Sequence, residues 1–528
     1  MSIAPLTLQA NYWENFELRD EDLEYLYNHL LEIETPLTAR ELAEVLVRER
    51  IRHEKESIER QIGSGATYFP KDQYAPGDKI RFPALQWEEG SVTGVRSGTN
   101  PEYPPFGVID VEFKKLGVKS FATGVENHKL NAPVGLSADD PSLDVEQVLR
   151  LHSKAIQTRL ADKFKQVPDL VQIAGAWFPR SLLVDVSIGH LNLAEAVLEV
   201  EEGGPLPTRN ILEQIELPTD VNLKLTEFSM NLALQEDERF DEVGPSGETL
   251  WFLNRLEPEE VQTPPFHLRY QAPANLAELG KPELIDELNA LVFDELETEA
   301  DEPNQANHIT VSLIYPHWRS GTIPLSSSIA RLFPTAYESP RVNFTFVDEE
   351  TSKRYNGWVV RPHHYVYGLK EWYEEKSLIP GSLFVIKQGK KPGEVLVQAL
   401  KKRPTKDWIR TVLVGVDGGV RFMMLKQQIS NNLDDRMTVM VPDPEAVDKL
   451  WEATGRARGT LESSVISIMR ELIKLSPQGH VHAQELYAGV NIIRRCPPGA
   501  ILQVLANHPE VSHLGDLYFK LSETTSEE

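Results

Sequence analysis

Few side chains in this sequence stand at spacings that could carry out chemistry. The histidine groups, His363-His364 and His480 with His482, lack cysteine or carboxylate partners at the spacing that zinc ligands require. The single cysteine, Cys496, is expected to pack in a core rather than to act as a nucleophile. The sequence has no phosphate-binding loop, no dinucleotide fingerprint and no Gly-x-Ser-x-Gly elbow. We therefore predict no catalytic residue, no metal site and no cofactor.

One acidic pattern could support nuclease chemistry. Glu112-Phe113-Lys114 ends a strand-like run, and Glu102 lies ten residues earlier. In metal-dependent nucleases, acids in such a pattern hold the ion and a lysine steadies the charge that develops. The intervening segment is rich in proline, and an alternating charged face on an exposed strand explains the same residues better. We therefore interpret these residues as a solvated strand face.

A strongly basic segment runs from Lys387 to Lys426. It contains ten basic and three acidic residues, a net charge of +7 in a chain whose total is −26. The basic residues are Lys387, Lys390, Lys391, Lys401, Lys402, Arg403, Lys406, Arg410, Arg421 and Lys426, of which the first eight are candidate DNA contacts. Trp408 adds a ring on which a base could stack. Two interpretations remain open: a phosphate-binding face, or a solvated edge strand whose lysines discourage aggregation.

The preceding segment, from Ile309 to Gln388, carries an ordered set of landmarks. A strand must end at Ile323-Pro324 because proline lacks the N–H donor, and Pro380-Gly381 predicts a turn before a closing strand. Trp358 and Trp372 supply large buried surfaces for a small barrel. The other landmarks are Ala330, Phe333-Pro334, Val342, Asp348, Arg361, Leu369, Leu378, Ser382 and Phe384. In this order they resemble the DNA-binding pseudobarrel of plant auxin response factors, which has relatives in some bacterial restriction enzymes.

This resemblance implies two arms that grip DNA in the major groove. By position, the first arm would consist of Trp318, Arg319, Ser320, Gly321 and Thr322. The second arm would consist of Arg361, His363, His364, Tyr365 and Tyr367. Arg319 would read a guanine edge, while His364 and Tyr365 would contact phosphate or base. The first arm is short and has one basic residue where family members usually have more.

The C-terminal residues look like a winged helix of the HARE type, which occurs in chromatin factors, an RNA-polymerase subunit and restriction enzymes. Helical patterns cover Leu461–Leu475 and Gly499–Asn507, with a further helix starting at Ala483–Tyr487. Two short strands around a Gly-Asp turn follow in Ser512–Leu521. If this unit contacts DNA, the candidate residues are Arg494, Arg495 and Gln503. Binding to a protein partner is the open alternative.

The whole pattern predicts a multidomain α+β protein with winged-helix-like helical units, a small SH3-like β-barrel and a central β-pseudobarrel. The expected domains are a helix-turn-helix-like unit at 1–66, the SH3-like barrel at 67–131, a winged-helix-like domain at 144–260, the pseudobarrel with its basic extension at 308–441, and the C-terminal winged helix at 460–522. The third could equally be a plain three-helix subdomain with a hairpin. Residues 132–143 and the acidic 293–308 are expected to be solvated linkers.

A weak internal repeat supports the helical assignments. An apolar helix, a polar turn and a capped second helix recur at Leu30–Leu42, Leu198–Leu212 and Leu472–Leu486. In the first copy, Thr38 and Glu41 have the spacing of a capping box. This is the entry geometry of a helix-turn-helix, although any αα-hairpin shares it.

Composition limits the class of function. The 528 residues include 54 Lys plus Arg against 80 Asp plus Glu, which excludes a protein that coats nucleic acid or an anionic membrane with its whole surface. We expect no signal peptide and no membrane span, and a cytoplasmic location. The first hypothesis is a non-enzymatic, bacterial-type protein that binds double-stranded DNA, associated with transcription or chromatin. The alternatives are a protein-interaction scaffold for RNA polymerase or a defence complex, and the specificity component of a restriction system.

Overall fold

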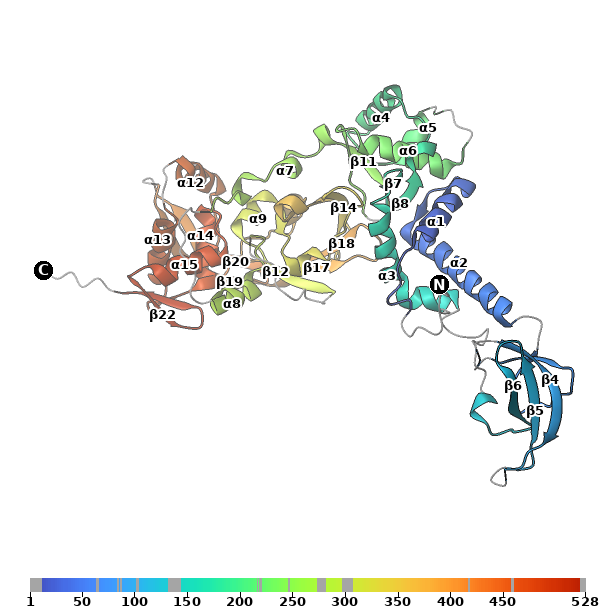
Figure 1. The fold of residues 1–528 in the computed structure, drawn as a ribbon. Coiled ribbons are helices and arrows are strands. Elements are labelled where there is room, and N and C mark those ends of the chain that lie inside the picture. The colour runs from blue at the N-terminus through green and yellow to red at the C-terminus, as the bar shows by residue number, and fades with distance from the viewer. Residues whose placement is uncertain are drawn as a thin grey trace. The chain divides into compact units, whose positions relative to one another are not determined.

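A computed structural model describes the chain from residue 12 to residue 522, apart from short gaps. The gaps are positions 63–65, 83–84, 86–87, 101–103, 132–143, 216, 218–220, 246, 273–281, 297–306, 416–417 and 457–459. The chain divides into two compact units, whose elements are labelled in Figure 1. The first unit is Met1–Val184 with Thr219–Phe228, and the second is Asp185–Pro218 with Ser229–Glu528. This division falls inside the domain expected at 144–260.

Three helices and a small sheet form one part of the first unit. The helices are α1 (Asp20–Ile33), α2 (Ala39–Ile62) and α3 (Val145–Phe164); the sheet has the order β1 (Leu37–Thr38), β8 (Ala176–Pro179), β7 (Leu170–Ile173). The predicted capping box is confirmed, because Thr38 N–H donates to Glu41 Oε2 at 2.7 Å and Glu41 N–H donates to Thr38 Oγ1 at 3.2 Å. From α3, Arg159 donates to the carbonyl of Glu14 at 2.8 Å. The helix at 145–164 therefore belongs with the N-terminal helices.

A five-stranded sheet forms the other part of the first unit. Its order is β2 (Ala66–Thr67), β3 (Lys79–Phe82), β4 (Glu88–Ser97), β5 (Gly107–Phe113) and β6 (Gly117–Thr123). The pairs from β3 to β6 are antiparallel, and β2 pairs parallel with β3. Tyr68, Phe82, Phe113 and Phe121 pack ring against ring on one face. Strands thus lie where the short β-rich runs predicted them.

The second unit opens with helices and a three-stranded sheet. The elements are α4 (Ile188–Val200), β9 (Leu206–Pro207), α5 (Thr208–Gln214), α6 (Leu223–Gln235), β10 (Phe240–Glu242) and β11 (Leu250–Leu253), with sheet order β10-β11-β9. The boundary between the units crosses α6, whose residues up to Phe228 belong to the first unit. Trp251 is completely buried, and its indole N–H donates to Thr208 Oγ1 and Asn231 Oδ1 at 3.0 Å. The short elements η6 (Asn254–Leu256), α7 (Glu259–Gln262), η7 (Phe266–Leu268) and α8 (Pro282–Val292) follow.

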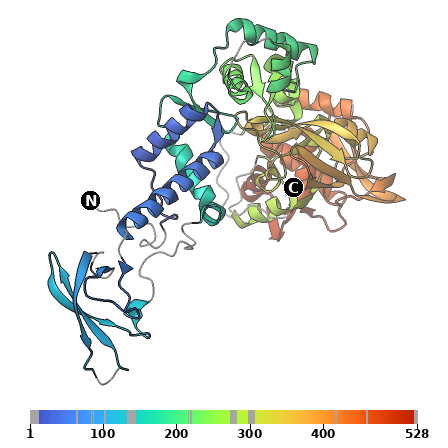
Figure 2. The same ribbon diagram turned by 90° about the vertical axis from the view of Figure 1, so that its right-hand side faces the viewer.

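A curled seven-stranded sheet, half a barrel, occupies the middle of the second unit (Figure 2). Its order is β12 (His308–Ser312), β17 (Leu383–Gln388), β18 (Glu394–Ala399), β14 (Arg341–Asp348), β15 (Arg354–Val360), β16 (Tyr365–Tyr367) and β13 (Thr322–Pro324). Strands β14 and β18 pair parallel, and the other pairs are antiparallel. The helices α9 (Tyr315–Ser320), α10 (Ser327–Ala330) and α11 (Lys370–Glu375) accompany the sheet. As predicted, a strand ends at Pro324 and a turn at Gly381 precedes β17.

The β10–β11 hairpin docks onto this curled sheet. Asn343 N–H donates to the carbonyl of Val243 at 2.8 Å, and Phe252 packs edge-on against Trp358 at 5.3 Å between ring centroids. Arg341 of β14 makes ion pairs with Asp241 at 3.1 Å and with Glu257 at 2.5 Å. The hairpin and the curled sheet therefore share buried apolar surface and buried charges.

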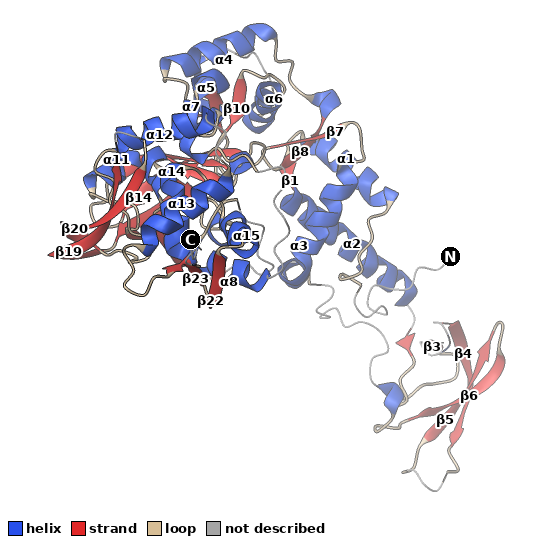
Figure 3. Ribbon diagram, turned by 90° about the vertical axis from the view of Figure 1, so that its left-hand side faces the viewer, coloured by secondary structure: helices blue, strands red, loops and turns tan. Residues whose placement is uncertain are grey.

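A long hairpin and a helical unit complete the chain (Figure 3). They comprise β19 (Lys401–Val414), β20 (Val420–Asn431), α12 (Pro444–Arg456), α13 (Leu461–Ile473), β21 (Val481–His482), α14 (Ala483–Ile493), α15 (Pro498–Asn507), β22 (Val511–Gly515) and β23 (Tyr518–Leu521), with sheet order β21-β23-β22. Val412 and Phe422 of the hairpin are buried in the same core as Val465 and Met469 of α13. Cys496 is also buried there, as predicted.

The structure describes only part of the linkers predicted from composition. The linker at 132–143 and positions 297–306 lie outside the described residues. The expectation of a solvated segment from 293 is wrong at its start, because Asp294 and Glu295 are only 4% and 5% exposed. Within the described residues, no helix is both long enough and apolar enough to cross a membrane.

Candidate nucleic-acid interface

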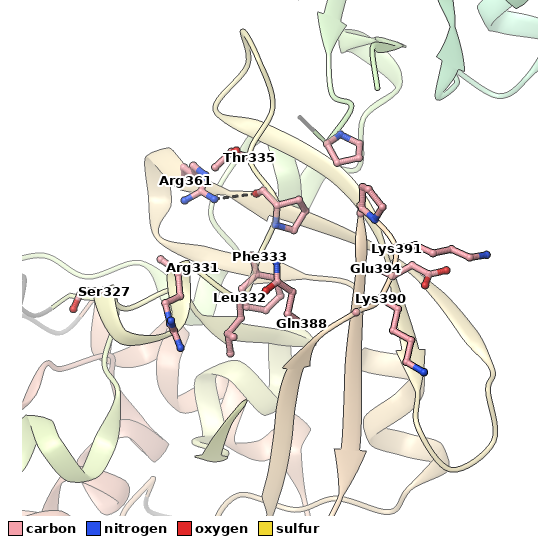
Figure 4. Close-up of a pocket in the computed structure, with 16 residues that line it drawn as sticks. Ser327, Arg331, Leu332, Phe333, Thr335, Arg361, Gln388, Lys390, Lys391 and Glu394 are labelled. Carbon is pink, nitrogen blue, oxygen red and sulfur yellow. Dashed lines mark hydrogen bonds between the residues drawn. The ribbon is translucent and has the colours of Figure 1, made fainter. Parts of the chain in front are cut away.

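A basic groove lies beside the curled sheet. It has a volume of about 730 Å³ and is open to solvent. Its charged lining residues are Arg331, Arg361, Lys390, Lys391 and Glu394. Figure 4 shows the two arginines on one side and the two lysines on the other. Four cations and one carboxylate thus line one groove.

Three loops of the sheet position these cations. Arg361 begins the short helix η8 (Arg361–His363) directly after β15, and Arg331 follows α10. The lysines lie on the turn between β17 and β18, which Gly389 closes by donating its N–H to the carbonyl of Glu394 at 2.9 Å. Gly393, with φ of +72°, lies so close to Pro245 that an added Cβ would stand 2.9 Å from the Pro245 ring. The docked hairpin therefore supports the lysine turn.

Arg361 is the most unusual residue of the groove. Its guanidinium donates from Nη2 to the carbonyl of Pro334 at 2.9 Å, while its buried Nε has no partner among the described residues. Burial lowers the pKa of Arg361, and no carboxylate in the described part of the chain pairs with it. A buried charge without a counter-ion and a buried N–H without an acceptor both cost free energy. An anion bound in the groove would supply both the counter-ion and the hydrogen-bond acceptor that Arg361 lacks.

The other cations of the groove are also uncompensated. Arg331, Lys390 and Lys391 are exposed, and among the described residues none of them has an ion-pair partner. Glu394 is already held by Arg354 of β15, with 2.8 Å between Nη1 and Oε1. The groove therefore presents an excess of positive charge.

The expected first arm is an internal element of the structure. The Trp318 indole N–H donates to the carbonyl of Leu378 at 2.8 Å, and Thr322 is fully buried. Arg319 is bound by Asp448 of α12, with 2.7 Å between Nη2 and Oδ2. Ser320 Oγ is buried without a partner, and Gly321 adopts φ of +67° where an added Cβ would meet Lys370. We therefore withdraw these residues from the DNA-contacting set, since their polar groups face the protein interior or a neighbouring helix.

The expected second arm is only partly accessible. His363 and His364 are exposed on the turn after Arg361. Tyr365 is 1% exposed, its hydroxyl donates to the carbonyl of Glu260 at 2.5 Å, and burial raises its pKa. Tyr367 is half-buried, and its pKa is raised for the same reason. Tyr365 is withdrawn because α7 covers it, whereas Arg361 and the two histidines remain candidates.

Four of the eight cations of the predicted basic segment that lie beyond the groove are neutralised within the protein. Four ion pairs, each 2.6–2.7 Å long, involve these cations. They are Lys387 with Glu349, Lys401 with Glu350, Lys402 with Asp407, and Arg410 with Glu485. Arg403 and Lys406 are exposed and have no ion pair among the described residues. The segment from Lys387 to Lys426, with its net charge of +7, therefore does not form a uniform binding face.

The C-terminal candidates also lie in different surroundings. Arg495 is buried and bridges Asp294 at 2.6 Å and Glu295 at 2.9 Å, so it is withdrawn as a DNA contact. Burial lowers the pKa of the Arg495 guanidinium, but the charges of Asp294 and Glu295 outweigh burial, so the pKa is raised. Arg494 donates from Nη1 to Ser464 Oγ at 3.4 Å, and Gln503 is half-buried on α15.

Arg331 is the groove residue that sequence reasoning missed. It lies thirty residues before Arg361, and no motif or spacing connects the two. Only the fold of the sheet brings the end of α10 opposite the β17–β18 turn. The one available signal was that Arg331 has no acidic residue close to it in the sequence, which is typical of a cation left free for a ligand.

The pattern considered for nuclease chemistry does not form a described site. Glu112 lies exposed on β5 and Lys114 follows the strand, whereas Glu102 lies outside the described residues. Among the residues with described positions, no group of three or more His, Cys, Asp or Glu side chains could hold a metal ion. Comparisons with protein-family models, curated proteins and solved structures found no match to this chain.

Proposed function

We propose that this chain is a non-enzymatic protein that binds double-stranded DNA through the basic groove, in association with transcription or chromatin. The observation that carries the proposal is Arg361, a half-buried cation that has neither an acceptor for its Nε nor a carboxylate partner among the described residues. Phosphate oxygens match this need, because a guanidinium can donate two hydrogen bonds to one phosphate.

The neighbouring cations fit the same ligand. Lys390 and Lys391 stand across the groove from Arg361 and would contact a second position of the phosphate backbone. His363 and His364 extend the accessible edge beyond Arg361. The net charge of −26 disfavours DNA contact over most of the surface, so contact is expected only at locally basic sites such as the groove.

The finer fold assignments support the proposal by analogy. We infer that the curled sheet is a pseudobarrel of the type found in auxin response factors and restriction enzymes, and that β2–β6 form an SH3-like barrel. Three helices with a small three-stranded sheet occur three times, in α1–α3 with β1, β7 and β8, in α4–β11 and in α13–β23, which is the layout of a winged helix. Such folds also host other functions, so the groove chemistry carries more weight than the likeness.

A titration of fluorescently labelled duplex DNA of random sequence tests the proposal. We expect binding at micromolar protein in low salt, and weaker binding by the variant Arg361→Met with Lys390→Gln and Lys391→Gln. The matched control is Lys401→Gln with Lys402→Gln, because these two lysines already pair with carboxylates of the chain. Absence of duplex binding by the unmodified protein would overturn the proposal.

A protein-interaction scaffold is the second candidate function. The observation that favours it is α4, on which Leu193 and Val200 are 52% and 80% exposed. These residues are seven positions apart and therefore share one helix face. Loss of a protein partner in the variant Leu193→Ser with Val200→Ser, with intact duplex binding, would assign partner binding to this face.

A further inference from the structure

The β19–β20 hairpin has an exposed aromatic and basic face. Trp408 is 61% exposed, and its cross-strand partner Lys426 places Nζ 5.6 Å from the ring centroid. Lys406 and Gln428 form the adjacent pair on the same face, because side chains two positions apart along a strand point the same way. An exposed tryptophan is therefore flanked by two lysines.

This face is not neutralised by the protein. Asp407 points to the opposite face of the ribbon, where it binds Lys402 at 2.7 Å and accepts a hydrogen bond from Thr405 Oγ1 at 2.8 Å. Neither Lys406 nor Lys426 has an ion-pair partner among the residues whose positions are described. Both ammonium groups can therefore bind an external anion.

The ribbon is anchored near its turn. Val412 and Phe422 are buried in the C-terminal core, and Arg410 binds Glu485 of α14 at 2.6 Å. The backbone of β19 also pairs with Met440, which donates to the carbonyl of Arg410 at 2.8 Å. The Trp408 ring is thus presented on a supported strand.

We propose that Trp408 stacks on an unpaired base of single-stranded DNA while Lys406 and Lys426 bind the adjacent phosphates. Lys426 covers one face of the ring, and the base would stack on the other. Lysines alone would protect an exposed strand from aggregation, whereas the exposed indole serves a ligand with a π-face. The inference rests on the proposed DNA-binding function and adds a second, single-strand site to it.

Binding of a labelled 12-nucleotide oligothymidylate to the full chain tests this site. Stacking energies of about 1–3 kcal/mol per base predict that Trp408→Ala weakens this binding at least about 5-fold, and that Trp408→Phe restores part of it. Leu413→Ala is the matched control, because Leu413 lies on the opposite face of the same ribbon and is 39% exposed. The Leu413→Ala variant should bind oligothymidylate with the affinity of the unmodified protein.

Blunt duplex DNA separates this inference from the proposed function. Trp408→Ala should bind blunt duplex as the unmodified protein does, whereas Arg361→Met should lose duplex affinity. Equal oligothymidylate affinity of Trp408→Ala and the unmodified protein would overturn the single-strand site, even if duplex binding is intact. No oligothymidylate binding by the unmodified protein would overturn it equally.

Discussion

Replacing Arg361 by methionine should separate stability from binding. The substitution removes one hydrogen bond, to the carbonyl of Pro334, and also removes one buried N–H for which the described part of the chain supplies no acceptor. A hydrogen bond from a charged group contributes about 1.5–3 kcal/mol, and an unsatisfied buried donor costs about 1–3 kcal/mol. These effects oppose each other, and methionine preserves much of the aliphatic packing. We therefore expect the free energy of unfolding to change by less than about 1 kcal/mol.

Duplex affinity should respond quite differently. Loss of a charge-assisted contact to phosphate, about 1.5–3 kcal/mol, corresponds to about 10- to 150-fold weaker binding. Urea unfolding followed by intrinsic fluorescence measures stability, and anisotropy of a labelled duplex measures affinity. If Arg361 served only the fold, Arg361→Met would lower the free energy of unfolding and leave duplex affinity unchanged.

The control for this pair of measurements is Arg341→Met. Arg341 lies on the same sheet but binds the buried Glu257 and the partly buried Asp241, so its removal leaves both carboxyl groups without this cation. This should lower the free energy of unfolding by about 3–5 kcal/mol. If Arg361→Met were equally destabilising and bound DNA normally, our reading of Arg361 as a ligand-binding residue would be refuted.

Three further predictions concern the surroundings of the groove and the C-terminal core. Arg495→Met should lower the free energy of unfolding by about 3–5 kcal/mol in urea titrations, because it leaves two buried carboxylates without their guanidinium counter-ion. Burial raises the pKa of Glu257 to about 8, so its stabilising contribution is full below about pH 4.5 and declines as the pH rises to 8. The free energy of unfolding should therefore fall less steeply between pH 4.5 and 8 in Glu257→Gln than in the unmodified protein. An equal fall in both proteins would count against the raised pKa of Glu257. Gly393→Ala should weaken duplex binding because its Cβ would press on Pro245, whereas Gly117→Ala, which has open space at a similar φ, should leave binding unchanged.

Local features of the fold were predictable because neighbouring residues determine them. Thr38 and Glu41 cap α2 as their spacing indicates, and the strand that ends at Pro324 follows from the missing proline N–H. The helical and strand-like runs at the C-terminus lie where periodicity placed them. Each of these signals spans only a few residues of the sequence.

The candidate site was less predictable because its chemistry depends on distant partners. Asp448 lies 129 positions after Arg319 in the sequence, and Asp294 lies 201 positions before Arg495. Acidic composition at 293–308 indicated a solvated linker, yet Asp294 and Glu295 are buried because Arg495 neutralises them. Whether a cation is free or paired is decided by such contacts, which local patterns do not encode.

The salt dependence of duplex binding tests the central proposal most directly. Each phosphate contact contributes a slope of about −0.9 to the logarithm of the binding constant against the logarithm of salt concentration. Neutralising Arg331, Arg361, Lys390 and Lys391 together should therefore make the slope shallower by about 3 to 4 and reduce affinity at every salt concentration. An unchanged slope in this variant would contradict the assignment of the groove as the DNA-binding site.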